Sequence, residues 1–156
     1  MKILYVAKHD SGGNDDENAI SFALRKLGHE VRCLPEGIGP SVTNEIADFC
    51  LIHKWEDLDN LKKVAQRMPV VCWYFDLVST DDVQLSERTG RRVTWMEQVM
   101  DLSTTVFCTD GDWADANPDK CIWLTQGADE RFVGPGEPIK NSLVAPIIFT
   151  GVTYGD

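Results

Sequence analysis

The sequence predicts a Rossmann-like α/β fold, a doubly wound parallel sheet with helices on both faces. Apolar segments of strand length alternate along the chain with segments of helical periodicity, and this alternation is typical of parallel strands joined by right-handed crossovers. The apolar segment at residues 70–75 shows little polar alternation, which indicates a central strand that is buried on both faces. The length of 156 residues suits one domain with a sizeable core.

Each predicted element follows from local pattern. Strands are expected at residues 2–7, 30–34, 49–52, 70–75, 104–108, 121–124 and 147–151, and helices at residues 14–27, 55–68, 91–100 and 111–116. The first helix has its apolar side chains on one face, at Ile20, Ala23, Leu24 and Leu27. Gly28 follows where a helix needs a left-handed residue to end. Residues 35–40 and 76–90 are polar or rich in Gly and Pro, and are expected to be loops.

Charge and cysteine content exclude several classes of protein. The formal net charge of −10 argues against a nucleic-acid partner and against an anionic membrane surface. No apolar stretch reaches the length of a membrane span. The five cysteines form no C-x-x-C pair, and Cys50, Cys72 and Cys108 lie in apolar segments where a thiol packs as a small hydrophobe. We therefore expect a cytoplasmic protein with reduced cysteines and no structural metal.

The position of a binding site follows from the expected strand order. In the order 3-2-1-4-5-6, the crevice of a doubly wound sheet lies between strands one and four, beyond their carboxyl ends. The loop at residues 9–14 and the loop that begins at Asp76 would meet there.

The turn after the first strand contains Gly12 and Gly13, but it lacks the spacing of a dinucleotide-binding motif. The residues that follow include Asp15, Asp16 and Glu17. These carboxylates suit the positive end of the helix dipole, and they would repel a phosphate. The turn therefore opens a cleft without the means to hold a nucleotide by itself.

Several residues near this crevice are candidates for a catalytic site. Asp76 could take a proton from a hydroxyl group, or it could be a helix cap or turn residue. His9 could act as a base oriented by Asp10, although adjacent side chains often point apart. The candidates for substrate binding are Ser11, Gly12, Gly13, His53, Asp110 and Trp113. His53 ends the third strand, which the expected order places nearer the edge of the sheet.

Six segments resemble, in order, the N-terminal half of a GT-B glycosyltransferase. They are MKILYVAKHDSGG, ALRKLGHEVRCL, ADFCLIHKW, MPVVCWYFDLV, STTVFCTDGDWADANPDKCIWLTQGADERF and IIFTGVTYGD. The chain is most similar to the CgeB-type (spore-maturation) glycosyltransferase-like group. Each motif alone recurs in many folds, so the resemblance rests on their order and spacing across about the whole chain.

The resemblance implies two domains, one that binds the acceptor and one that binds the donor. Residues 1–140 would form a Rossmann-like domain that faces the acceptor, and residues 141–156 would begin a truncated second domain. A C-terminal domain would hold the nucleotide-sugar donor, and the acceptor would be a hydroxyl of a glycan, protein or small molecule. No metal or other cofactor is implied. The chain would be a fragment of a longer enzyme or a truncated relative.

Two other classes of function remain open from the residues. One is a non-catalytic Rossmann-like binding or interaction module. The other is a flavodoxin-like regulatory domain, but its phosphoacceptor site needs an acidic cluster and a lysine that the sequence pattern does not place.

Overall fold

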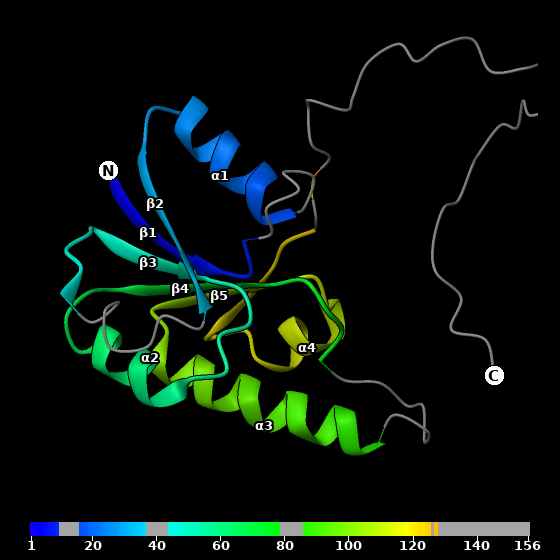
Figure 1. Ribbon diagram of the computed structural model, residues 1–156. Helices are drawn as coiled ribbons and strands as arrows, with labels where there is room; N and C mark the ends of the chain where they lie inside the picture. The colour runs from blue at the N-terminus through cyan, green and yellow to red at the C-terminus, as the bar shows by residue number, and fades with distance from the viewer. Residues whose placement is uncertain (10–15, 37–43, 79–85, 126, 128–156) are drawn as a thin grey trace, which may run out of the picture.

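The computed structural model describes residues 1–9, 16–36, 44–78, 86–125 and 127. Six strands form one parallel sheet: β1 (Lys2–Ala7), β2 (Glu30–Pro35), β3 (Phe49–Ile52), β4 (Val70–Tyr74), β5 (Thr105–Cys108) and β6 (Cys121–Trp123). The helices are α1 (Asp16–Lys26), α2 (Leu58–Ala65), α3 (Ser86–Leu102) and α4 (Gly111–Ala116). Helix α1 lies on one face of the sheet, and α2, α3 and α4 lie on the other (Figure 1). The predicted fold class is confirmed.

The boundaries of two helices differ from the prediction. Helix α3 begins at Ser86, so residues 86–90 are helical and not part of a loop. Helix α2 is shorter than predicted, because Asp57 caps it by accepting a hydrogen bond from the backbone N–H of Asn60 at 3.1 Å. Trp55 lies before this cap and is buried in the core. The strand expected at residues 147–151 and the second domain expected from residue 141 lie outside the described residues.

The strand order is β2-β1-β3-β4-β5-β6, so the predicted order was wrong. Strand β3 pairs with β1, with Ile3 opposite Phe49, and β2 becomes the edge strand. The charged residues explain why β2, and not β3, is the edge strand. Strand β2 contains the exposed Glu30 and Arg32, which an edge strand tolerates. Strand β3 has no charged residue and is buried along most of its length, which requires a central position. The crevice of the sheet consequently lies between β1 and β3, and not between β1 and β4.

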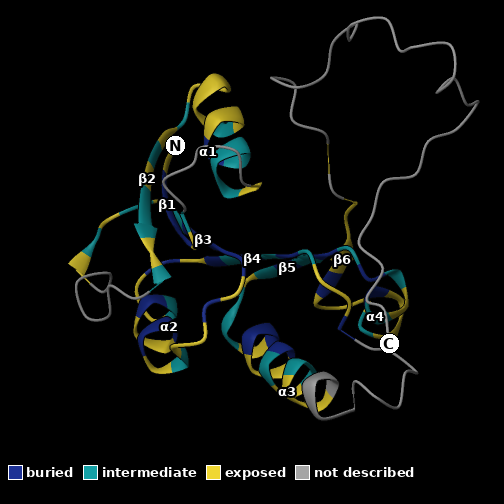
Figure 2. Cartoon of the chain, turned by 45° about the vertical axis from the view of Figure 1, so that its right-hand side comes forward, coloured by how far each residue is buried: buried dark blue, intermediate teal, exposed yellow. Residues whose placement is uncertain are grey.

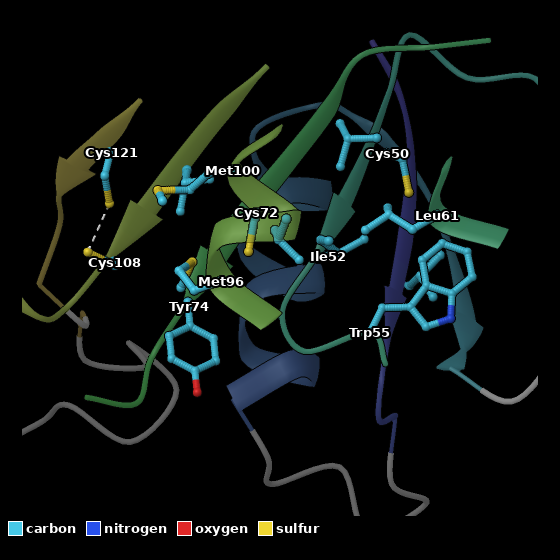
Figure 3. Packing of buried hydrophobic residues seen from close by; sticks show 14 of the residues in the cluster. Cys50, Ile52, Trp55, Leu61, Cys72, Tyr74, Met96, Met100, Cys108 and Cys121 are labelled. Atoms are coloured by element: carbon cyan, nitrogen blue, oxygen red, sulfur yellow. Dashed lines mark hydrogen bonds between the residues drawn. The ribbon is translucent and has the colours of Figure 1, made fainter. Parts of the chain in front are cut away.

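The two faces of the sheet are packed unequally (Figure 2). On the face covered by α2, α3 and α4, one large cluster joins side chains of the central strands, such as Ile52, with Leu61 of α2 and Met96 of α3 (Figure 3). On the face covered by α1, the cluster that the described residues form has four buried hydrophobic members: Ile3, Tyr5, Ala7 and Leu51. Trp73 of β4 points to this second face and is half-buried. The expectation that residues 70–75 are buried on both faces therefore holds for only one face.

Candidate functional site

The carboxyl edge of the sheet has its topological switch point between β1 and β3. The chain leaves β1 toward α1 on one face and leaves β3 toward α2 on the other face. This divergence opens the position where doubly wound sheets bind ligands. His53, which immediately follows β3, is therefore beside the switch point, and the prediction that it lies nearer the sheet edge was wrong.

Tyr5 and His53 form a buried polar pair that links three neighbouring strands. The Tyr5 hydroxyl donates a hydrogen bond to Nε2 of His53, and Nδ1–H of His53 donates to the backbone carbonyl of Trp73 at 2.6 Å. This arrangement assigns the Nδ1–H tautomer to the neutral imidazole. Tyr5 was not a candidate from the sequence. The sequence did contain a signal for such a partner, because His53 ends an otherwise apolar strand. A histidine that is buried there needs a hydrogen-bond partner.

The environment of His53 keeps its imidazole uncharged. Burial lowers the pKa of His53 to about 4; the hydrogen bond to Trp73 opposes this change and the nearby His9 adds to it. The side chain is 5% exposed, so water cannot compensate a positive charge there. His53 is therefore a neutral hydrogen-bonding group at pH 7, and both of its ring nitrogens are occupied.

His9 lies above Tyr5 at the end of β1. Its Nε2–H donates to the backbone carbonyl of Tyr5 at 3.2 Å, and its ring meets the Tyr5 ring edge-on with centroids 4.9 Å apart. The other ring nitrogen, Nδ1, has no hydrogen-bond partner within the described ranges. The partner that the sequence suggested, Asp10, lies outside the described residues, as do Ser11, Gly12 and Gly13. The His9–Asp10 pair therefore stays a prediction.

Asp76 follows β4 and is directed toward α3. Its Oδ2 lies 3.6 Å from Nη2 of Arg92, and 52% of its side chain is exposed. Strand β3 separates β4 from β1, which places two strand spacings, about 10 Å, between their ends. The prediction that Asp76 and His9 face each other across one crevice was therefore wrong. Asp76 pairs instead with Arg92 of α3.

Asp110 and Trp113 occupy structural positions in β5–α4. The Asp110 carboxylate caps α4 by accepting from the Trp113 backbone N–H at 3.1 Å, and its Oδ2 accepts from the Val78 N–H at 2.9 Å. Asp110 is only 4% exposed. Trp113 packs against the large hydrophobic cluster. These contacts favour roles in packing and capping for both residues; their role in substrate binding stays a prediction.

The beginning of α1 and the end of β2 form an acidic part of this edge. Asp16 and Glu17 lie in the first turn of α1. Burial raises the pKa of Glu36, and the negative charges of Glu17 and Glu56 raise it further. Negative charge therefore accumulates where a nucleotide-binding domain would place phosphate. Asp15 lies outside the described residues.

All five cysteines are free thiols. Four are buried, and burial raises the pKa of Cys50 and of Cys121 to about 12. The sulfur atoms of Cys108 and Cys121 are 3.1 Å apart on neighbouring strands (Figure 3). Across the described ranges, no three His, Cys, Asp or Glu side chains are grouped so that they could hold a metal ion. No described helix is long and apolar enough to cross a membrane.

Comparisons with known proteins identify no family for this chain. No family model matches it, and neither does any curated protein. Among solved structures, it is similar to a flavodoxin from Streptococcus pneumoniae TIGR4, with 12% sequence identity and a TM-score of 0.41. That similarity covers 84% of this chain and 89% of the flavodoxin.

Proposed function

We propose that this chain is the acceptor-side domain of a GT-B glycosyltransferase, which transfers a sugar from a nucleotide-sugar donor to a hydroxyl group. The observation that carries the proposal is the acidic first turn of α1, with Asp16 and Glu17 beside the switch point. In nucleotide-binding domains of this architecture the phosphates lie at that helix N-terminus. Carboxylates at that position repel the diphosphate of the donor. The substrate that this domain can bind is therefore the acceptor, which reacts through an uncharged hydroxyl group.

Asp76 is the proposed general base. Arg92 positions one of its oxygens, Oδ2, and the other has no partner among the described residues. In the proposed reaction the acceptor hydroxyl gives its proton to Asp76, its oxygen bonds to the anomeric carbon, and the nucleoside diphosphate leaves. The donor would be held by a second domain, and the reaction would occur in the cytoplasm.

The test uses the protein that the full reading frame encodes, assayed for release of nucleoside diphosphate from a panel of nucleotide sugars with hydroxyl acceptors. The substitution Asp76→Asn should lower turnover by roughly 10²–10⁴-fold, the range for one acid–base group. Asp101→Asn is the matched control, because Asp101 is also an exposed aspartate in an ion pair, with Lys120. It should retain full turnover. Full activity of Asp76→Asn, or an equal loss in the control, would refute the assignment.

A second candidate is a non-catalytic interaction module, and one observation favours it. Trp73, Phe107 and Ile122 are in register across β4, β5 and β6 on the α1 face, and Ile122 is 51% exposed. An apolar row of this kind suits a protein partner. A reading frame that encodes no second α/β domain after Asp156, in a protein without transferase activity, would favour this candidate.

A further inference from the structure

A basic hollow lies at the carboxyl edge, on the face covered by α2 and α3. It has a volume of about 460 Å³ and is lined by six residues: Lys54, Glu56, Tyr74, Arg91, Arg92 and Trp95. A second hollow of about 550 Å³ adjoins it between α2 and α3 and shares Arg91 and Trp95 with it. Volumes of this size suit a small organic ligand.

The charge of the hollow is opposite to that of the chain. Three cationic side chains line it against one carboxylate, that of Glu56, although the formal net charge of the whole chain is −10. Asp76 offsets part of this charge by pairing with Arg92 at 3.6 Å. Lys54 and Arg91 are exposed and have no ion pair in the described part of the chain. Lys54 also lowers the pKa of Glu36 by its charge, so Arg91 is the cation of the hollow for which the described residues show no acidic partner.

The wall of the hollow is rigid and aromatic. The indole N–H of Trp95 donates to the backbone carbonyl of Trp55 at 3.0 Å, which fixes the plane of the indole. The rings of Tyr74 and Trp95 lie 5.3 Å apart at an angle of 39°. Arg92 is held in place by donating to the Leu77 carbonyl at 3.0 Å, and its Nε–H has no acceptor in the described ranges.

We propose that this hollow binds the anionic group, a phosphate or a carboxylate, of a small ligand whose ring lies against Trp95. Guanidinium groups bind both anions through paired hydrogen bonds. Lys54, which also lines the hollow, adds a point charge, and Glu56 can accept hydrogen bonds from hydroxyl groups of the ligand. The proposal concerns binding alone and does not depend on the transfer of a sugar.

Nuclear magnetic resonance of the ¹⁵N-labelled chain tests this proposal through the indole N–H signal of Trp95. The probes are phenyl phosphate, benzoate and the uncharged benzyl alcohol. We expect a saturable shift with a dissociation constant of about 1 mM or below for at least one anion, and no saturable shift with benzyl alcohol. Tighter binding of phenyl phosphate than of benzoate would assign the ligand as a phosphate ester, and the reverse would assign a carboxylate.

Two variants and one control make the test specific. Arg91→Gln and Lys54→Gln should each weaken binding by roughly tenfold, because each removes a charged hydrogen bond. Arg67→Gln makes the same change in charge at an exposed residue that lines neither hollow, and it should bind as tightly as the unmodified chain. The proposal is overturned if neither anion gives a saturable shift, if both variants bind normally, or if all three substitutions weaken binding equally.

Discussion

The two faces of the sheet differ in how the helices that cover them are packed. The face under α2, α3 and α4 is an apolar core that includes the completely buried Ile52 and Leu61. The face under α1 contains few buried apolar side chains among the described residues, and it carries a polar pair, Tyr5 and His53, at its carboxyl end. The first face therefore supplies most of the packing energy. The second face carries a hydrogen-bonded network beside the switch point, where binding sites form.

The largest expected difference between the faces is in stability. Leu61 of α2 is completely buried, whereas Leu24 of α1 is only partly buried. The substitution Leu61→Ala should lower the free energy of unfolding by about 3 kcal/mol, because it leaves a cavity in a packed core. The same substitution at Leu24 should cost about 1 kcal/mol, because less apolar area is lost. Urea unfolding of both variants measures the difference, and equal losses would contradict the unequal packing of the two faces.

The two faces should also differ in how their stability responds to pH. The pKa of His53 is about 4 in the folded chain and about 6.5 in an unfolded one. Between these values the unfolded chain binds a proton that the folded chain does not. The neutral His53 therefore contributes up to about 3 kcal/mol to the free energy of unfolding. This stabilisation is complete above pH 6.5 and is lost as the pH falls toward 4.

The substitution His53→Asn should remove this component of the pH dependence, because an amide does not titrate. Urea unfolding between pH 7 and pH 4 measures it. His29→Asn is the control and should keep the slope of the unmodified chain, since His29 lies in the turn after α1 and no hydrogen bond of the described residues joins it to Tyr5 or Trp73. An unchanged slope in His53→Asn would mean that His53 is not held neutral by the fold.

The sequence was sufficient for the fold class and for most elements, because their signals are local. The alternation of apolar strand-length segments with segments of helical periodicity predicted the parallel sheet. Gly28, with a φ of 86°, ends α1 as predicted by donating to the Arg25 carbonyl at 2.9 Å. The start of α3 was missed, because residues 86–90 are polar and contain a glycine, a pattern typical of loops.

The site was harder to predict, because its geometry depends on the order of the strands. Strand order is a non-local property. Because β3 pairs with β1, the crevice lies between β1 and β3 and not between β1 and β4. This order separates Asp76 from His9 and brings His53 beside β1. The charged residues Glu30 and Arg32 on β2 were the available signal for an edge strand. The basic hollow combines residues that follow β3, end β4 and lie on α3, and no sequence spacing reveals such a combination.

The central claim is that this domain serves the acceptor and leaves the nucleotide to another domain. Calorimetric titration of the chain with UDP and other nucleoside diphosphates tests it most directly. The same titration of Arg91→Gln weakens any contribution of the basic hollow, because it removes one of its three cations. We expect the first turn of α1, with Asp16 and Glu17, to prevent tight binding, so that no dissociation constant is below about 100 μM in either protein. A constant of about 1 μM or tighter, close to −8 kcal/mol, would contradict the claim.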